Sequence, residues 1–333
     1  MSAPKAQVTR RTMLAGAAAG LAVSPLAKPA IAQSGWPNSR QITLLNPFPA
    51  GGGTDAFARP LAALLDQQMN TRFIVENRGG AGGTLGASAA AKASPDGYTL
   101  FVGAAHHTIA PSIYPNLDYS LEKDFIPIGM IARPPQVMSV NPVKVPEKTL
   151  AEFIASALAN PGKYSFASSG NGTVHHLCAE LFQLVTGTRM THIPYRGAGP
   201  AMQDLVGGQI DLMFDGLGSS ANQINGGTIK GLAVASAQRA SAVPDVPTMA
   251  EAGLKDFEVS TWYALWAIKG TPPEIVERMT AELLKALDNP TIKDTWQKNG
   301  SEVIKLTGKE FGAYVTAETA RWAKVVADAK VKL

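Results

Sequence analysis

The chain has little of what enzymes and small secreted scaffolds depend on. Its 333 residues include a single cysteine, Cys178, so no disulfide can form within the chain, which excludes a disulfide-rich scaffold. Cys178 falls inside a predicted helix, where a small buried side chain is expected rather than a nucleophile. Charged residues make up 17% of the sequence and hydrophobic residues 45%, a composition typical of a packed protein with a large core.

Catalytic and nucleotide-binding motifs are also missing. The glycine run at residues 51–53 is followed by no lysine, which excludes a P-loop, and neither 51–53 nor 170–172 reaches a third glycine at dinucleotide-binding spacing. No G-x-S-x-G elbow occurs. Four of the five histidines form adjacent pairs, whose side chains point about 100° apart on a helix, unlike the i, i+4 pair of a zinc site. We therefore expect no catalytic residue, no metal and no cofactor.

Net charge disappears once the first 32 residues are set aside. They contain Lys5, Arg10, Arg11 and Lys28 and no acidic residue, so the rest of the chain carries 26 basic and 26 acidic side chains. Without a basic field the chain has no electrostatic basis for binding nucleic acid or a membrane surface. We expect no nucleic-acid partner.

The N-terminus has the layout of an export signal. Arg10 and Arg11 precede an alanine-rich apolar run at 13–23, and residues 30–32 offer a small-x-small cleavage site before Gln33. The paired arginines favour the twin-arginine route, with general secretion as the alternative. A membrane anchor is the other alternative, but the run is shorter than the ~18 residues that a span requires.

A glycine-rich strand-to-helix turn occurs twice in the sequence. The first, at residues 44–55, reads LLNPFPAGGGTD, and the second, at 164–173, reads YSFASSGNGT. Small side chains in such a turn leave backbone N–H groups exposed at the positive end of a helix dipole, which suits an anion. Two such turns, more than a hundred residues apart, predict two lobes that hold one anionic ligand from both sides.

Strand-like and helix-like segments alternate along the chain, which predicts an α/β protein with mainly parallel sheets. Proline-rich extended chain at 131–141 indicates a crossover into a second lobe, which opens with a capping-box pattern at 149–152. A second crossover is expected near 257–268. The first lobe would then be built from both ends of the sequence, an arrangement that allows hinge closure on a ligand. Two amphipathic helices, beginning near Thr271 and Thr307, are expected to end the chain.

Pro60 breaks the local pattern. It falls inside the helix that follows the first glycine turn, where a proline costs about 3 kcal/mol. We expect this helix either to begin near Arg59 or to kink at the proline.

At these residues the sequence resembles the periplasmic solute-binding receptors of tripartite tricarboxylate transporters, the Bug/TctC type. The resemblance covers essentially the whole chain after residue 32, with the motifs in the family's order. They are PFPAGGGTD (47–55), ENR with GAGGT (76–84), PDGYTL (95–100), SGNGT with HL (169–177), PYRG (194–197), GGQIDLMFD (207–215) and PDVPT with EAG (244–253).

The resemblance implies the α/β fold of a two-lobe, type II-like periplasmic binding protein, each lobe a mainly parallel sheet flanked by helices. Residues 1–32 would be the signal peptide, 33–135 and 261–333 the first lobe, and 136–260 the second. The implied function is a periplasmic receptor, monomeric and not an enzyme, that delivers a small carboxylate to the membrane permease subunits. Family ligands include di- and tricarboxylates, aromatic carboxylates and acidic or amidated amino acids.

The resemblance also implies where the ligand lies. One ligand carboxylate would lie between the two glycine turns, held mainly by backbone amides and ordered water. Asp55 would organise the first turn, with a plain helix-start acid as the alternative, and Asp215 would face the cleft. His106 or His107 would reach the ligand's far end, with a solvated or packed histidine as the alternative. The expected ligand-binding residues are Phe48, Ala50, Gly51, Gly52, Asp55, His106, Ser168, Ser169, Gly170, Asn171, Gly172, Thr173 and Asp215.

Three positions depart from the family pattern. Pro60 stands where a leucine-like residue is usual, Gly79 replaces a proline, and the pair at 106–107 replaces a single histidine. The last two bear on ligand choice. Two other functions stay open: a receptor that signals to a sensor kinase instead of serving transport, and an exported hydrolase, against which the missing motifs argue.

Overall fold

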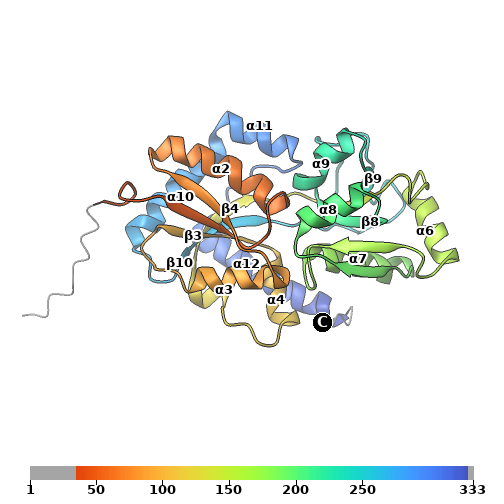
Figure 1. The fold of residues 1–333 in the computed structure, drawn as a ribbon, viewed down its shortest axis with the longest axis horizontal. Coiled ribbons are helices and arrows are strands. Elements are labelled where there is room, and N and C mark those ends of the chain that lie inside the picture. Colours follow the sequence, from red (N-terminus) through yellow and green to blue (C-terminus); the bar gives the residue numbers. More distant parts are fainter. Residues whose placement is uncertain (1–34, 329–333) are drawn as a thin grey trace, which may run out of the picture. The chain divides into compact units, whose positions relative to one another are not determined.

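The computed structural model describes residues 35–328 as two five-stranded sheets flanked by helices (Figure 1). We call the first sheet with its helices lobe I and the second sheet with its helices lobe II. The expected signal peptide lies outside the described residues.

The lobe I sheet has the strand order β2-β1-β3-β10-β4. Strands β1, β2 and β3 are parallel, and β10 is antiparallel to both of its neighbours, so four strands run one way and one is reversed. The strands are β1 (Ile42–Asn46), β2 (Phe73–Asn77), β3 (Thr99–Ala104), β4 (Phe125–Ala132) and β10 (Tyr263–Ile268).

The lobe II sheet repeats this pattern, with the order β7-β6-β8-β5-β9 and β5 as the reversed strand. Its strands are β5 (Gln136–Val140), β6 (Ser165–Ser168), β7 (Thr191–Pro194), β8 (Leu212–Gly216) and β9 (Lys230–Val234). Each sheet is therefore mainly parallel, as expected. The reversed strand in each sheet is the one that the chain enters on crossing from the other lobe.

The two crossover segments lie side by side. The Gln136 amide donates to the Val259 carbonyl at 2.9 Å, and the Thr261 amide donates to the Pro134 carbonyl at 3.1 Å. A pair of extended segments joined in this way can act as a hinge, because few residues need to change their backbone angles. The exact lobe boundaries, at 135/136 and 260/261, stay a prediction.

Helices cover both faces of each sheet. In Figure 1, α2 and α11 lie on one side of the lobe I sheet and α3, α4 and α12 on the other. Lobe I contains α2 (Gly53–Met69), the short 3-10 helix η1 (Ala81–Gly83), α3 (Thr84–Ala91), α4 (His106–Ile113), α5 (Leu121–Asp124), α10 (Pro273–Asp288), α11 (Pro290–Lys298) and α12 (Gly308–Asp328). Lobe II contains α6 (Leu150–Ala159), α7 (Val174–Thr186), α8 (Ala198–Val206) and α9 (Leu217–Asn225).

Both expected C-terminal helices are present, as α10 and α12, but the sequence analysis missed α11, which directly follows α10. Asn289 ends α10 in an extended conformation, and its side-chain oxygen accepts from the Thr291 amide at 2.9 Å, which caps α11. Pro290 then occupies the first position of the new helix, where its missing N–H costs nothing.

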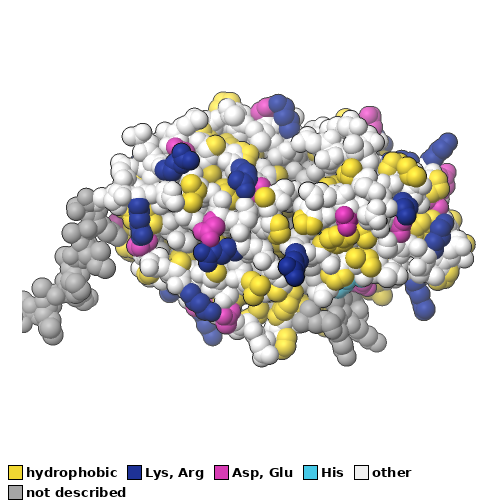
Figure 2. Space-filling model, in the orientation of Figure 1, with side chains coloured by type: hydrophobic (Ala, Val, Ile, Leu, Met, Phe, Trp, Pro, Cys, Tyr) yellow, Lys and Arg dark blue, Asp and Glu magenta, His cyan; other side chains and the backbone are white. Residues whose placement is uncertain are grey.

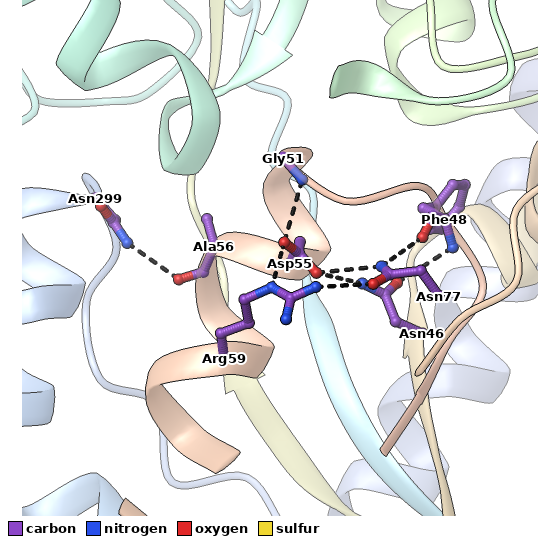
Figure 3. Close-up of polar contacts among 8 residues, drawn as sticks. All are labelled: Asn46, Phe48, Gly51, Asp55, Ala56, Arg59, Asn77 and Asn299. Atoms are coloured by element: carbon purple, nitrogen blue, oxygen red, sulfur yellow. Dashed lines mark hydrogen bonds and ion pairs between the residues drawn. The ribbon is translucent and has the colours of Figure 1, made fainter. Parts of the chain in front are cut away.

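Helix α2 runs through Pro60, so the expectation of a start near Arg59 is wrong. Proline cannot donate to the carbonyl four residues earlier, which here belongs to Ala56. That carbonyl instead accepts from the Asn299 side-chain amide at 3.4 Å (Figure 3). Asn299 follows α11, so a helix from the other end of the chain replaces the lost hydrogen bond.

Two smaller expectations are confirmed. Thr149 and Glu152 form the capping box at the start of α6, with the Glu152 amide 3.2 Å from the Thr149 hydroxyl. Cys178 lies fully buried in α7, and this burial raises its pKa well above the ordinary value for a thiol. A buried, protonated thiol is a poor nucleophile.

The surface has no field of one sign on the face shown in Figure 2, where basic and acidic side chains are interspersed. This agrees with the equal numbers of basic and acidic residues after residue 32. None of the helices in the described part of the chain combines the length and the apolar character that a bilayer crossing requires.

Candidate functional site

Four glycine-rich turns meet between the lobes, where the sequence predicted two. Lobe I contributes residues 49–53 and 79–83, and lobe II contributes 168–173 and 197–199. A Cβ placed on Gly79 or on Gly197 would lie 2.5 Å from the Pro49 Cδ, and one on Gly170 would lie 3.2 Å from the Gly82 amide nitrogen. Only glycines allow the four backbones to approach this closely. The lobes are therefore in direct contact, in a closed arrangement.

Asp55 holds the first turn in shape (Figure 3). Its Oδ2 accepts from the Gly51 amide at 3.1 Å and from Arg59 Nε at 2.7 Å, while its Oδ1 accepts from Asn77 Nδ2 at 3.1 Å. Burial raises the pKa of this carboxyl, but the hydrogen bonds from Arg59, Gly51 and Asn77 outweigh it and the pKa is lowered. Both oxygens are thus engaged within lobe I, so Asp55 is placed to organise the turn; a direct ligand contact stays a prediction.

The first turn leaves the end of its helix open. Gly52 occupies the N-cap position of α2 and no side chain caps that helix. The amides of Gly53 and Thr54, in its first turn, have no acceptor within the helix. Helix α8 of lobe II also begins without a side-chain cap, after Gly197. A Cβ on Gly52 would lie 3.6 Å from the Gly199 amide nitrogen, so the positive ends of two helices lie close together across the interface.

The second turn differs, because its own side chains and backbone use its amides. The Gly170 amide donates to Ser168 Oγ at 3.1 Å and the Gly172 amide to His176 Nδ1 at 3.2 Å. The Thr173 hydroxyl caps α7 by accepting from the His176 amide. The expectation that this turn leaves its amides free is wrong at these positions, since the Ser168 hydroxyl and the His176 imidazole accept from them.

His106 connects the two predicted turns across the interface. It is the first residue of α4, it is buried, and its Nδ1 accepts from the Val174 amide of lobe II at 3.1 Å. Its ring also meets the Phe48 ring edge-on, with centroids 5.1 Å apart. Burial, with the neighbouring His175 and His107 adding to it, lowers the pKa of His106 well below 6.5. A neutral imidazole is what this acceptor role requires.

His107 faces the interior of lobe I. Its Nδ1 lies 3.0 Å from the Ala104 amide and its Nε2 lies 3.4 Å from the Gly83 carbonyl oxygen. Burial lowers its pKa to about 4. Of the two adjacent histidines, only His106 has a bond to lobe II, and neither is solvated, so the packed alternative describes His107.

Asp215 lies fully buried in β8. Its Oδ2 accepts from the hydroxyls of Ser219 at 2.6 Å and Ser220 at 2.5 Å. Its Oδ1 has no hydrogen-bond partner, and His175 Nε2 lies 3.5 Å away. A carboxylate held on one oxygen and unpaired on the other is an unusual feature of a protein interior.

Sequence reasoning missed two tyrosines at the interface. Tyr114 donates its hydroxyl to the Asn171 carbonyl at 2.9 Å and so joins lobe I to lobe II. The Tyr263 hydroxyl lies beside Gly53 and 3.5 Å from a Cβ placed on Gly216. Burial, and then the negative charge of Asp215, raise the Tyr263 pKa. No local pattern marks either tyrosine, because both reach the interface only through the packing of the lobes.

The remaining expected residues lie on the same loops. Ala50 and Gly51 are exposed, while the other glycines and serines of the two turns are buried and Asn171 is half-buried. The Ser169 hydroxyl has no partner. Within residues 35–328, no group of three or more histidine, cysteine, aspartate or glutamate side chains is arranged to hold a metal ion.

A separate hollow of about 1020 Å³ lies on the hinge side and has none of the expected ligand-binding residues in its lining. It is formed by the crossover segments and by the chain after α11, with Arg133, Ser260 and Glu302 among its residues.

Comparison with known proteins gives a consistent result. The chain matches the family model described as tripartite tricarboxylate transporter family receptor over residues 57–331. It is 36% identical to BugT of Bordetella pertussis over 297 residues, which are 89% of this chain and 91% of that protein. Its fold is similar to that of R. palustris Rpa4515 with adipate (34% identity, TM-score 0.86, 89% of this chain and 99% of that chain). It is also similar to MatC from Rhodopseudomonas palustris with bound malate (34% identity, TM-score 0.81, 86% of this chain and 99% of that chain).

Proposed function

Because the chain belongs to the family of tripartite tricarboxylate transporter receptors, we propose that it captures a small carboxylate between its lobes and delivers it to a membrane permease. The observation that carries this proposal is the meeting of the uncapped N-termini of α2 and α8 across the interface. A carboxylate between them would accept from backbone amides of both lobes, without a facing arginine.

The ligand would hold the lobes together. In the open form, the amides at the start of α2 and of α8 are hydrated separately. In the closed form, one anion interacts with both helix dipoles, and water is excluded, so the attraction strengthens. The bonds from Val174 to His106 and from Tyr114 to Asn171 add to closure without touching the ligand.

Relatives support the choice of ligand class. Structures of similar proteins contain adipate and malate, both of which are dicarboxylates. The family supports delivery to a permease, and the family together with the export-signal pattern of residues 1–32 supports a periplasmic location. We further propose that the ligand is released unchanged, so the protein is a receptor and not an enzyme.

Thermal unfolding with a panel of mono-, di-, tri- and aromatic carboxylates tests the proposal. The purified protein is first unfolded and refolded to remove any molecule from the host. A ligand at ~100 times its dissociation constant adds about 2.7 kcal/mol, which raises the midpoint by a few degrees. The amide or methyl ester of each active compound is the matched control and should give no shift. A panel without a single carboxylate-specific shift would overturn carboxylate capture.

Delivery requires its own experiment. Uptake of the identified ligand should depend on both this protein and a tripartite permease. A protein that binds the ligand tightly but whose deletion leaves uptake unchanged would overturn delivery while capture still stands.

A further inference from the structure

The hinge-side hollow of about 1020 Å³ has the two crossover segments as its floor. An antiparallel bridge joins these segments at Pro135 and Ser260. Side chains on an extended segment alternate between its two faces. Arg133 and Pro135 of one segment and Glu258 and Ser260 of the other, each pair two positions apart, line the hollow. These four residues therefore mark one face of the paired segments.

The opposite face of the paired segments looks toward the proposed ligand site. A Cβ placed on Gly216 would lie 3.6 Å from Pro134 Cγ and 3.1 Å from Thr261 Cγ2, two residues that alternate with those of the hollow. The Tyr263 hydroxyl lies 3.5 Å from the same Cβ and also lies beside Gly53, at the start of α2. The paired segments therefore separate the hollow from the region where the lobes meet.

The two walls of the hollow belong to different lobes. One wall is the segment 235–241, which directly follows β9 of lobe II. The other wall is formed by α11, residues 300–304 and α12, all of lobe I. A rotation about the paired segments that separates the lobes at the ligand site must therefore bring these two walls together.

Both walls begin at the hinge itself. In the lobe II wall, the Ala235 amide donates to the Gln136 carbonyl at 2.8 Å, and the Ala235 carbonyl accepts from the Val259 amide at 3.0 Å. In the lobe I wall, Ser301 Oγ accepts from the Arg133 amide at 2.9 Å. Because each wall is attached beside the pivot, the hollow narrows in step with the opening of the ligand site.

The room in the hollow, and not its charge, is the property that bears on function. Of its four lysine and arginine side chains, three are paired with carboxylates of their own lobe at 2.8–3.3 Å. Glutamate side chains also line it, so it is not built to hold an ion of one sign. It is instead a space into which a wall can move when the lobes separate.

We propose that the walls of the hinge-side hollow set the affinity for the ligand from a distance, because the room between them determines how readily the lobes open. This inference rests on the proposed capture of a ligand between the lobes. Larger side chains on the walls fit into the hollow in the closed form but meet the opposite wall on opening. They therefore raise the closed fraction, and the apparent dissociation constant falls as that fraction rises.

Ala237→Trp tests the inference from the lobe II wall. Ala237 is exposed and lines the hollow, so an indole at this position adds bulk without disturbing the core. Calorimetry measures its affinity for adipate and malate, which are bound in two similar structures. We expect binding to tighten by about threefold to tenfold. Ala155→Trp is the matched control: it adds the same side chain at an exposed position of α6, outside the hollow, and should leave the affinity unchanged.

Hydrogen exchange of the Val174 amide, followed by NMR, measures opening without any ligand. This amide donates to His106 across the interface in the closed form and becomes free to exchange when the lobes separate. If the closed form predominates without ligand, we expect Ala237→Trp to slow this exchange by about threefold to tenfold. If the open form predominates, the gain in affinity carries the whole effect.

Gln297→Trp repeats both measurements from the lobe I wall. Gln297 is an exposed residue of α11 that lines the hollow, and we expect a change in the same direction as for Ala237→Trp. Unchanged affinity together with unchanged exchange in both variants would overturn the inference, as would weaker binding with faster exchange. Binding of no carboxylate in the wider panel would instead overturn carboxylate capture, and the exchange of the Val174 amide would still decide the role of the hollow.

Discussion

The two glycine turns look alike in sequence but differ in what their amides do. The turn before α2 has no side-chain cap, so the first amides of its helix remain open. Asp55 stabilises this turn by accepting a hydrogen bond from the Gly51 amide. The turn before α7 is capped by Thr173, and the first amide of its helix donates to His106 of the other lobe. The first turn thus has free donors for the anion that we propose, while the second turn holds the lobes together. Substitutions in each of the two turns can test this difference.

The largest effect is expected from Gly172→Val in the second turn. An added Cβ would lie 2.9 Å from Ile113 Cγ2 of lobe I, so the lobes could not close fully. We expect at least about a 100-fold loss of affinity, or ~2.7 kcal/mol, measured by calorimetry with the identified ligand. Gly162→Val is the control, because Gly162 also has a positive φ, of 81°, but nothing within 4 Å. Affinities within threefold of each other in the two variants would contradict a closing role for this turn.

Gly52→Ser should convert the first turn into a copy of the second. Gly52 has φ −88° and ψ 176°, which a serine adopts without strain, and its hydroxyl would cap α2. The hydroxyl would take an amide that the ligand needs, so we expect affinity to fall about tenfold while the unfolding midpoint without ligand holds or rises slightly. Gly52→Ala adds the same Cβ without the oxygen. If both variants lose affinity equally, the amides of α2 do not bind the anion.

Lowering the pH should weaken binding through His106. The closed form keeps this imidazole neutral, whereas in an opened form it is hydrated and titrates near its ordinary pKa of ~6.5. Protons therefore favour opening, so closure is fully supported above pH 6.5 and is lost progressively below it, by up to about tenfold per pH unit. Calorimetry between pH 7.5 and 5.5 measures this slope.

His106→Gln sharpens the pH experiment. The glutamine carbonyl oxygen can accept from the Val174 amide at every pH, so the slope should become shallower. Burial also lowers the pKa of His175. This residue adds the same pH dependence to the original protein and to the variant. Identical slopes would show that His106 does not control closure.

The smallest effect is expected from Gly51→Ala. Gly51 has φ +81°, so alanine there is strained and should reduce the free energy of unfolding by about 1–2 kcal/mol. A Cβ at this position has nothing within 4 Å, so we expect affinity to change by less than about threefold. Chemical denaturation and calorimetry separate the two quantities. A loss as large as that of Gly52→Ser would place the anion at Gly51 itself.

The fold was predictable where the pattern is local. Alternating strands and helices, the capping box at 149–152 and the crossover near 131–141 follow from apolar periodicity and from a few proline, threonine and glutamate positions. The path of α2 through Pro60 was not predictable. It depends on Asn299, which follows another helix more than 200 residues later and satisfies the carbonyl that proline leaves unpaired.

The candidate site was predictable in its parts and not in its arrangement. The first turn was identified from the sequence, whereas Asp55 and Asp215 were named through the family resemblance. Asp55 accepts hydrogen bonds from the Gly51 amide and from Arg59 and so holds the turn. The turns at 79–83 and 197–199 were recognised only as parts of the family's motifs, and their meeting with the other two turns was not predicted. Their role depends on Pro49, which fits against glycines of both lobes.

The sequence by itself determined the helix start at the capping box, where the backbone can turn tightly, and that the chain after residue 32 has no net charge. The first two depend on residues within a few positions of one another, and the third depends on composition alone. Only the tertiary structure decided which amides are available to a ligand. The Val174 amide is engaged because a histidine 68 residues away lies beside it, and the amides at the start of α2 are open because no side chain caps that helix. Whether a hydrogen-bond donor is free depends on acceptors brought from elsewhere in the chain, and no local pattern records them.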